Sequence, residues 1–163
     1  MVTIVLFTSS HWFSKIIQFV LGSKIGHAAI GFEKDGKQFF LHAAWGGVQI
    51  STKESVMSNH SIVAEFEILP DMSDELALAE TKVGKPYDTV GLLGYLAVLF
   101  AKKFGIGLHN PLASKSAVVC SEFVMELDVN NEIPEFNGLT PSDITPKDLF
   151  HICSSGKSFK LIT

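Results

Sequence analysis

Two apolar runs separated by a short polar turn constrain the fold of this chain most strongly. The runs cover residues 26–32 and 38–44, and the segment 33–37 joins them. Asp35-Gly36 at its centre is a strong hairpin signal, because a type I′ turn needs a positive φ angle at both central positions. With these two residues as the turn, the partners on the two strands are set. The sequence therefore predicts an antiparallel hairpin with a defined register.

This register places two histidines on one face of the hairpin. Side chains alternate with a period of two, so His27 shares a face with Ala29 and Gly31 of its own strand and with His42 of the next. The two imidazoles become diagonal neighbours, with Cβ atoms about 7–8 Å apart. The small residues beside His27 leave room for a helix to lie across this face. One strand histidine is most simply structural, but two on one face favour a functional site.

A second informative stretch is 116–128, in which four apolar residues beginning with Cys120 have helical spacing. Residues 117–119 are small and β-branched, so we expect the helix to begin close to Cys120. A thiol at that point feels the positive end of the helix dipole and unpaired N–H groups, and both favour the thiolate. An inert, buried cysteine is the simpler alternative, and we interpret Cys153 in that way.

The other segments predict a mixture of strands and short helices. Glu75, Glu80 and Lys82 are interpreted as the solvated side of an amphipathic helix that ends before Gly84. Strands are expected at 2–7, 48–50, 61–69 and 158–162, and helices at about 11–21, in a single turn from 52, at 70–83 and from Thr145 onward, where Thr-Pro-Lys-Asp is a typical N-terminus.

The apolar run 90–101 is ambiguous between the protein core and a lipid surface. It is too short to span a bilayer, which takes about 20 residues. A buried helix is the simplest interpretation, and a membrane-facing or acyl-chain-binding helix is the alternative. A loop over 104–115 then leads to Cys120.

Composition excludes several classes of function. With 163 residues and 47% hydrophobic content, the chain is expected to form one domain over residues 1–163. The net charge is −4 and all 13 basic residues are lysine, so we expect no nucleic-acid partner. The first ten residues lack the features of a secretory signal, and two distant cysteines do not suggest a disulfide. We therefore expect a cytoplasmic protein, with an exported or phage origin left open.

Cys120, His27 and His42 together match the requirements of a cysteine hydrolase. Such an enzyme needs a nucleophilic thiol, an imidazole that takes its proton and a polar group that orients the imidazole. Two imidazoles and a thiolate could instead bind zinc, but the sequence has no CxxC or HxxxH spacing and no evident fourth ligand. We expect neither a metal nor another cofactor.

The order of these motifs resembles a known superfamily. Gly-His-Ala-Ala-Ile-Gly at 26–31 is followed by a strand with a histidine, by Gly-Lys-Pro-Tyr-Asp at 84–88 and by Val-Val-Cys-Ser-Glu-Phe-Val at 118–124. This order is similar to that of the circularly permuted NlpC-like papain-fold hydrolases, a superfamily shared with the lecithin:retinol acyltransferase group. In ordinary papain-like enzymes the cysteine helix precedes the histidine strands, whereas here it follows them. The resemblance covers roughly residues 22–150.

The resemblance implies a fold, an activity and a set of roles. The fold would be α+β and papain-like, with a small antiparallel sheet packed against the cysteine helix. Cys120 would be the nucleophile, His27 the base and His42 the orienting residue, with Tyr87 near the oxyanion site. The acyltransferases have Asn-Cys where this chain has Val119-Cys120, which argues against acyl transfer.

The expected function is therefore a thiol hydrolase, or cysteine peptidase, that cleaves an amide bond through an acyl-enzyme intermediate. The substrate would be a peptide, for example of the cell wall. A lipid acyl hydrolase or acyltransferase acting on a lipid-like acyl substrate is one alternative, with membrane association not favoured. A catalytically silent binding domain is another.

Overall fold

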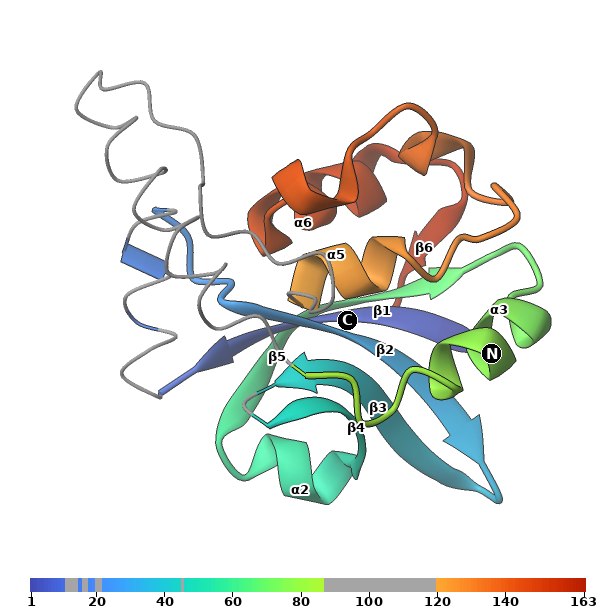
Figure 1. Cartoon of the computed structure of the whole chain (residues 1–163). Helices are drawn as coiled ribbons and strands as arrows, with labels where there is room; N and C mark the ends of the chain where they lie inside the picture. The colour runs from blue at the N-terminus through green and yellow to red at the C-terminus, as the bar shows by residue number, and fades with distance from the viewer. Residues whose placement is uncertain (11–14, 16–17, 20–21, 45, 87–119) are drawn as a thin grey trace.

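A six-stranded antiparallel sheet with strand order β4-β3-β2-β1-β5-β6 organises the chain. The computed structural model describes residues 1–10, 15, 18–19, 22–44, 46–86 and 120–163 (Figure 1). The strands are β1 (Val2–Ser9), β2 (His27–Lys34), β3 (Lys37–Ala44), β4 (Gly47–Thr52), β5 (His60–Ile68) and β6 (Phe159–Leu161). The helices are α2 (Lys53–Met57), α3 (Ser73–Glu80), α5 (Cys120–Met125) and α6 (Pro146–Ser155), with 3₁₀ turns η1 (Pro134–Phe136) and η2 (Pro141–Asp143). The α+β class is confirmed.

The predicted hairpin is present with the predicted register. Asp35 and Gly36 have φ angles of 53° and 70°, as a type I′ turn requires. Strands β2 and β3 pair from Lys34↔Lys37 to Ile30↔Leu41. The local turn chemistry therefore set the partners of this hairpin, and with them the faces on which its side chains lie.

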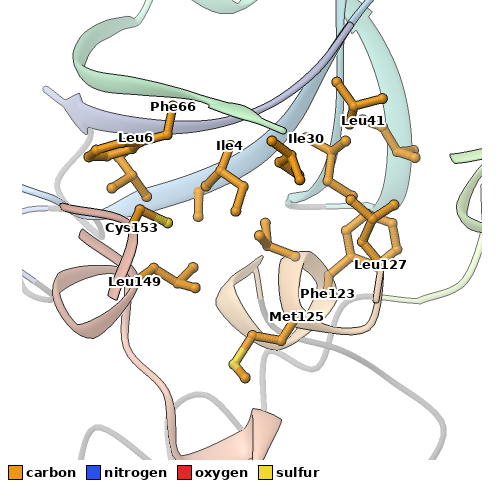
Figure 2. Close-up of a cluster of buried hydrophobic side chains, with 14 of the residues drawn as sticks. Ile4, Leu6, Ile30, Leu41, Phe66, Phe123, Met125, Leu127, Leu149 and Cys153 are labelled. Atoms are coloured by element: carbon orange, nitrogen blue, oxygen red, sulfur yellow. The ribbon is translucent and has the colours of Figure 1, made fainter. Parts of the chain in front are cut away.

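The sheet is covered on both faces, by different elements. On one face, which we call the helix face, Ile30 and Leu41 pack with Phe123 of α5 (Figure 2). Helix α6 covers the same side, where Leu149 and Cys153 belong to the same buried cluster. The opposite side, which we call the histidine face, carries a smaller apolar cluster closed by α2, formed by Val5, Phe7, Ala29, Phe40 and Val56.

The expectation that the cysteine helix lies across Ala29 and Gly31 is wrong. A Cβ atom at Gly31 would meet the side chains of Thr3 and Val5 on β1, so neighbouring strand residues already fill the space above these small side chains. Helix α5 packs on the helix face instead. All of residues 2–7 are buried, and a strand that is apolar on both sides requires cover on both faces, which the hairpin alone does not reveal.

The segment after β5 departs from the prediction in its polar contacts. Helix α3 ends at Glu80, and a turn continues to Gly84, whose φ angle is 89°. Glu75 was expected in solvent, but its side chain is buried, with 3% exposed, and accepts a hydrogen bond from Asn130. Lys82 forms an ion pair with Glu126 at 2.7 Å. These partners lie far away in sequence, so helical periodicity could not identify them.

The remaining expected elements have mixed outcomes. Helix α6 begins after Thr145 with a capping box to Asp148, as predicted. Of the helix expected at 11–21, Lys15, Gln18 and Phe19 have helical backbone, and the rest lies outside the described residues, as does the run 90–101. In the part of the chain that the structure describes, no helix has the length and apolar character needed to cross a bilayer.

Candidate active site

The two predicted histidines lie against each other at the end of the β2–β3 hairpin. Strands β2 and β3 pair as far as Ile30. The first residues of β2, including His27, pair with β1 on the other side. His27 Nε2 lies 3.0 Å from His42 Nδ1, and the ring planes are inclined by 72°. Both side chains are buried. The hairpin register therefore brings the two imidazoles into direct hydrogen-bonding contact.

A serine that the sequence analysis missed extends this contact. His42 Nε2 lies 3.1 Å from the hydroxyl oxygen of Ser51 on β4. Strand β4 pairs Ser51 with Phe40, and directly paired residues share a face of the sheet. Extending the predicted hairpin register into the next strand would have placed Ser51 on the histidine face.

One of the two directions in which these hydrogen bonds can run gives the proton positions that a base requires. A hydrogen bond between two neutral imidazoles uses one N–H and one lone pair. If His27 donates from Nε2 to His42, and His42 donates from its Nε2 to Ser51, the lone pair of His27 remains on Nδ1. This tautomer presents Nδ1 of His27 as the proton acceptor of the site.

Burial keeps both imidazoles neutral. Desolvation is the largest influence on the pKa of His27, which lies well below its ordinary value of 6.5, and the positive charges of His42 and then His60 lower it further. Desolvation, followed by the charge of His60, lowers the pKa of His42 to about 4. At neutral pH the pair is uncharged, which is the form of imidazole that acts as a general base.

Cys120, the first residue of α5, meets strand β2 at the backbone of Ala28, the residue that follows His27. The backbone N–H groups of Ala28, of Ser121 and of Cys120 itself lie close to the Cys120 sulfur and favour its thiolate. The strand that carries the predicted base therefore also holds the predicted nucleophile.

The expectation of a lowered thiol pKa is wrong for the resting site. Burial raises the pKa of the Cys120 thiol, and this effect exceeds the opposing influence of the three nearby backbone N–H groups. The side chain is 6% exposed, and loss of solvent disfavours the thiolate more strongly than the end of a short helix favours it. The resting thiol is protonated and must lose its proton during any reaction.

Comparisons with known proteins support the fold and leave the chemistry open. No family model and no curated protein matches this sequence. The crystal structure of the metalloprotein YiiX from Escherichia coli O157:H7 (DUF1105) is similar, with a TM-score of 0.63 at 14% identity over 99% of this chain and 94% of YiiX. The likeness shows the fold alone.

A metal site is not assembled from the described side chains. Among residues 1–10, 15, 18–19, 22–44, 46–86 and 120–163, no three of the histidine, cysteine, aspartate and glutamate side chains are arranged to hold a metal ion. Between His27 and His42, the facing nitrogens contact each other at 3.0 Å.

Tyr87, assigned to the oxyanion site by resemblance, lies outside the described residues. The residues that precede it run along strand β4. Val48 donates its N–H to the carbonyl of Lys85, and Gly84 donates to the carbonyl of Val48, both at 2.8 Å. Val48 pairs with Ala43, the neighbour of His42 in sequence. The Gly-Lys-Pro part of the motif therefore borders the histidine end of the sheet.

Proposed function

We propose that this chain is a thiol hydrolase with a permuted NlpC-like papain fold, in which Cys120 is the nucleophile, His27 the general base and His42 the orienting residue. The observation that carries the proposal is the junction of β2 with α5. There the Ala28 N–H holds the Cys120 sulfur, while the neighbouring His27 is bound through Nε2 to His42 at 3.0 Å.

The first step is attack on the carbonyl carbon of an amide. The thiol proton of Cys120 passes to Nδ1 of His27 as the sulfur forms its bond to carbon. Both groups start neutral because burial raises the pKa of the thiol and lowers that of the imidazole. The ion pair of sulfur and imidazolium is thus avoided in the resting site, and His42 accepts the Nε2–H of the imidazolium that forms during the attack.

The remaining steps release the amine with the thiol proton and restore the starting protonation of the site with a proton from water. The tetrahedral intermediate expels the amine, which takes the proton from Nδ1 of His27, and a thioester on Cys120 remains. A water molecule then gives a proton to His27 while its oxygen attacks the thioester carbonyl. The carboxylic acid leaves, and the thiol of Cys120 recovers its proton.

The developing oxyanion requires donors close to the sulfur. The Cys120 N–H lies close to its own sulfur. Once the sulfur is bonded to carbon, this N–H can donate to the oxyanion, and such a donor is typically worth about 3 kcal/mol. The role of Tyr87 as a further donor rests on the resemblance alone.

Acyl-enzyme trapping tests the proposal directly. The full chain is incubated with an activated acyl ester and with the corresponding amide, and the mass of the intact protein is followed over time. We expect one acyl adduct on Cys120, absent from Cys120→Ala and retained in the matched control Cys153→Ala. An adduct that persists in Cys120→Ala, or no adduct in the unsubstituted chain, would contradict the assignment.

The same readout separates the substrate classes. Peptidoglycan fragments are expected to give a peptidyl adduct and a released amine. Phospholipid vesicles that give a fatty-acyl adduct would favour the lipid acyl hydrolase or acyltransferase, and an added amine or lysolipid acceptor distinguishes transfer from hydrolysis. A chain that forms no adduct with any donor would be a catalytically silent binding domain.

A further inference from the structure

A β-bulge in β5 brings a third histidine to the site. The register between β1 and β5 shifts by one residue between Leu6 and Phe7, where Val63 is skipped. One extra residue reverses the face of every residue beyond it. His60 therefore lies on the histidine face, whereas an unbroken register would place it on the helix face. Bulges often occur next to active sites, where they redirect a side chain in this way.

His60 packs directly against His27. Their ring centroids are 5.6 Å apart, with the planes inclined by 43°. Phe7 of β1 completes the contact, with its ring centroid 5.9 Å from His60 and 6.1 Å from His27. With His42 bound at Nε2, the His27 ring is thus bordered by side chains from strands β1, β3 and β5.

The ring of His60 is anchored by helix α2. Its Nδ1 lies 3.1 Å from the backbone carbonyl oxygen of Val56. A carbonyl oxygen only accepts hydrogen bonds, so Nδ1 carries a proton in the neutral form of His60. Val56 itself belongs to the apolar cluster of the histidine face. The position of His60 is therefore set by the same helix that closes this face.

Four elements lie around His27, and two of them, β3 and β5, bring side chains that can carry a positive charge. His42 on β3 and His60 on β5 are titratable, and each disfavours a positive charge on His27. Cys120 on α5 lies beyond Ala28, and β1 contributes the uncharged Phe7. The nearest carboxylate in the β1–β5 ladder on this face is Glu65, which pairs with Val5 and is hydrogen-bonded to Thr3 and Gln38.

We propose that His60 is a positioning residue for His27: anchored on α2, its ring holds the His27 imidazole against His42 and opposes a positive charge on it before the substrate reacts. The inference deepens the proposed function, on which it rests for the role of His27 as base. The charge of His60 is also one of the causes that lower the pKa of His27, in agreement with the contact between the two rings.

Nuclear magnetic resonance of the histidine side chains tests this inference without any substrate. Long-range ¹H–¹⁵N correlation spectra of the full chain report the tautomer and the titration midpoint of each imidazole. His60→Phe keeps a ring but loses the Nδ1 donor, and His60→Asn keeps an N–H donor but loses the ring. The control is His151→Phe, the same substitution at an exposed histidine of α6.

Removing the charge of His60 makes protonation of His27 easier, so the midpoint of His27 should rise by about 1 pH unit in both His60 variants. It should stay unchanged in the His151→Phe control. In the unsubstituted chain, neutral His60 should be the Nδ1–H tautomer. An Nε2–H tautomer, or an unchanged His27 midpoint in folded His60 variants, would overturn the inference.

Alkylation of Cys120 by iodoacetamide in the same variants links the result to reactivity. If His27 assists the thiol, the acidic limb of the rate–pH profile should shift upward together with the His27 midpoint. The spectra decide whether His60 positions His27, and acyl-enzyme trapping decides whether Cys120 is a nucleophile. Either proposal can therefore fail while the other stands.

Discussion

Replacing His42 by phenylalanine probes the contact on which the candidate site depends. The substitution preserves an aromatic ring of similar size and removes both ring nitrogens. In the native site these nitrogens lie 3.0 Å from His27 Nε2 and 3.1 Å from the Ser51 hydroxyl. His27 is buried, so its Nε2–H would lose its partner in a place that water does not readily reach.

The magnitude follows from that unpaired donor. A buried donor left without a partner costs about 1–3 kcal/mol, and half-buried Ser51 adds little because its hydroxyl can bond to water. The free energy of unfolding should therefore decrease by about 1–3 kcal/mol. If a similar amount is lost from the transition state, acylation of Cys120 slows about 5- to 150-fold.

Urea denaturation at pH 7.5 measures the first effect, and the rate of acyl-adduct formation measures the second. His151→Phe serves as the control, and His27→Ala should abolish acylation altogether because it removes the base itself. If His42→Phe matches the control in both stability and acylation rate, the hydrogen bond between the two histidines contributes neither to the stability of the fold nor to acylation.

Three further outcomes test other parts of the argument. Cys120 should react with iodoacetamide at pH 7 faster than Cys153, whose pKa burial raises to about 12; equal rates would remove the support for base assistance. Burial lowers the pKa of His42 from 6.5 to about 4, so the contribution of neutral His42 to the free energy of unfolding is complete above pH 6.5. As the pH falls to about 4, this contribution of roughly 3 kcal/mol is lost. A free energy of unfolding that stays constant between these pH values would refute the lowered pKa. Gly47→Ala should destabilise more than Gly46→Ala, by about 1–3 kcal/mol, because both positions have positive φ but only a Cβ at Gly47 meets the backbone at the 84–86 segment; equal melting temperatures would show that this contact is dispensable.

Features with local causes were predictable from the sequence. Asp35-Gly36 specifies a turn type, the turn type specifies the register, and the register places His27 and His42 on one face. The start of α6 at Thr145 follows in the same way from a capping box within four residues. In each case the residues that decide the structure are neighbours in the chain.

Features decided by distant partners were not predictable in this way. Glu75 lies on a helix whose pattern suggested solvent, and it is buried because Asn130 reaches it from another part of the chain. Ser51 enters the site only through the pairing of a third strand with the hairpin. The contact of Glu75 with Asn130 has no signature in the sequence, and the hairpin register points to Ser51 only once the partner of the third strand is known.

The sequence by itself determined the hairpin, the shared face of its two histidines and the helix that begins near Cys120, because turn chemistry and side-chain periodicity act over a few residues. Only the tertiary structure decided that α5 packs on the other face, that the thiol of Cys120 is protonated at rest and that a bulge at Val63 turns His60 toward His27. Burial and strand register depend on how all the elements fill space together. Desolvation therefore reversed the pKa shift that the helix terminus alone had suggested for Cys120.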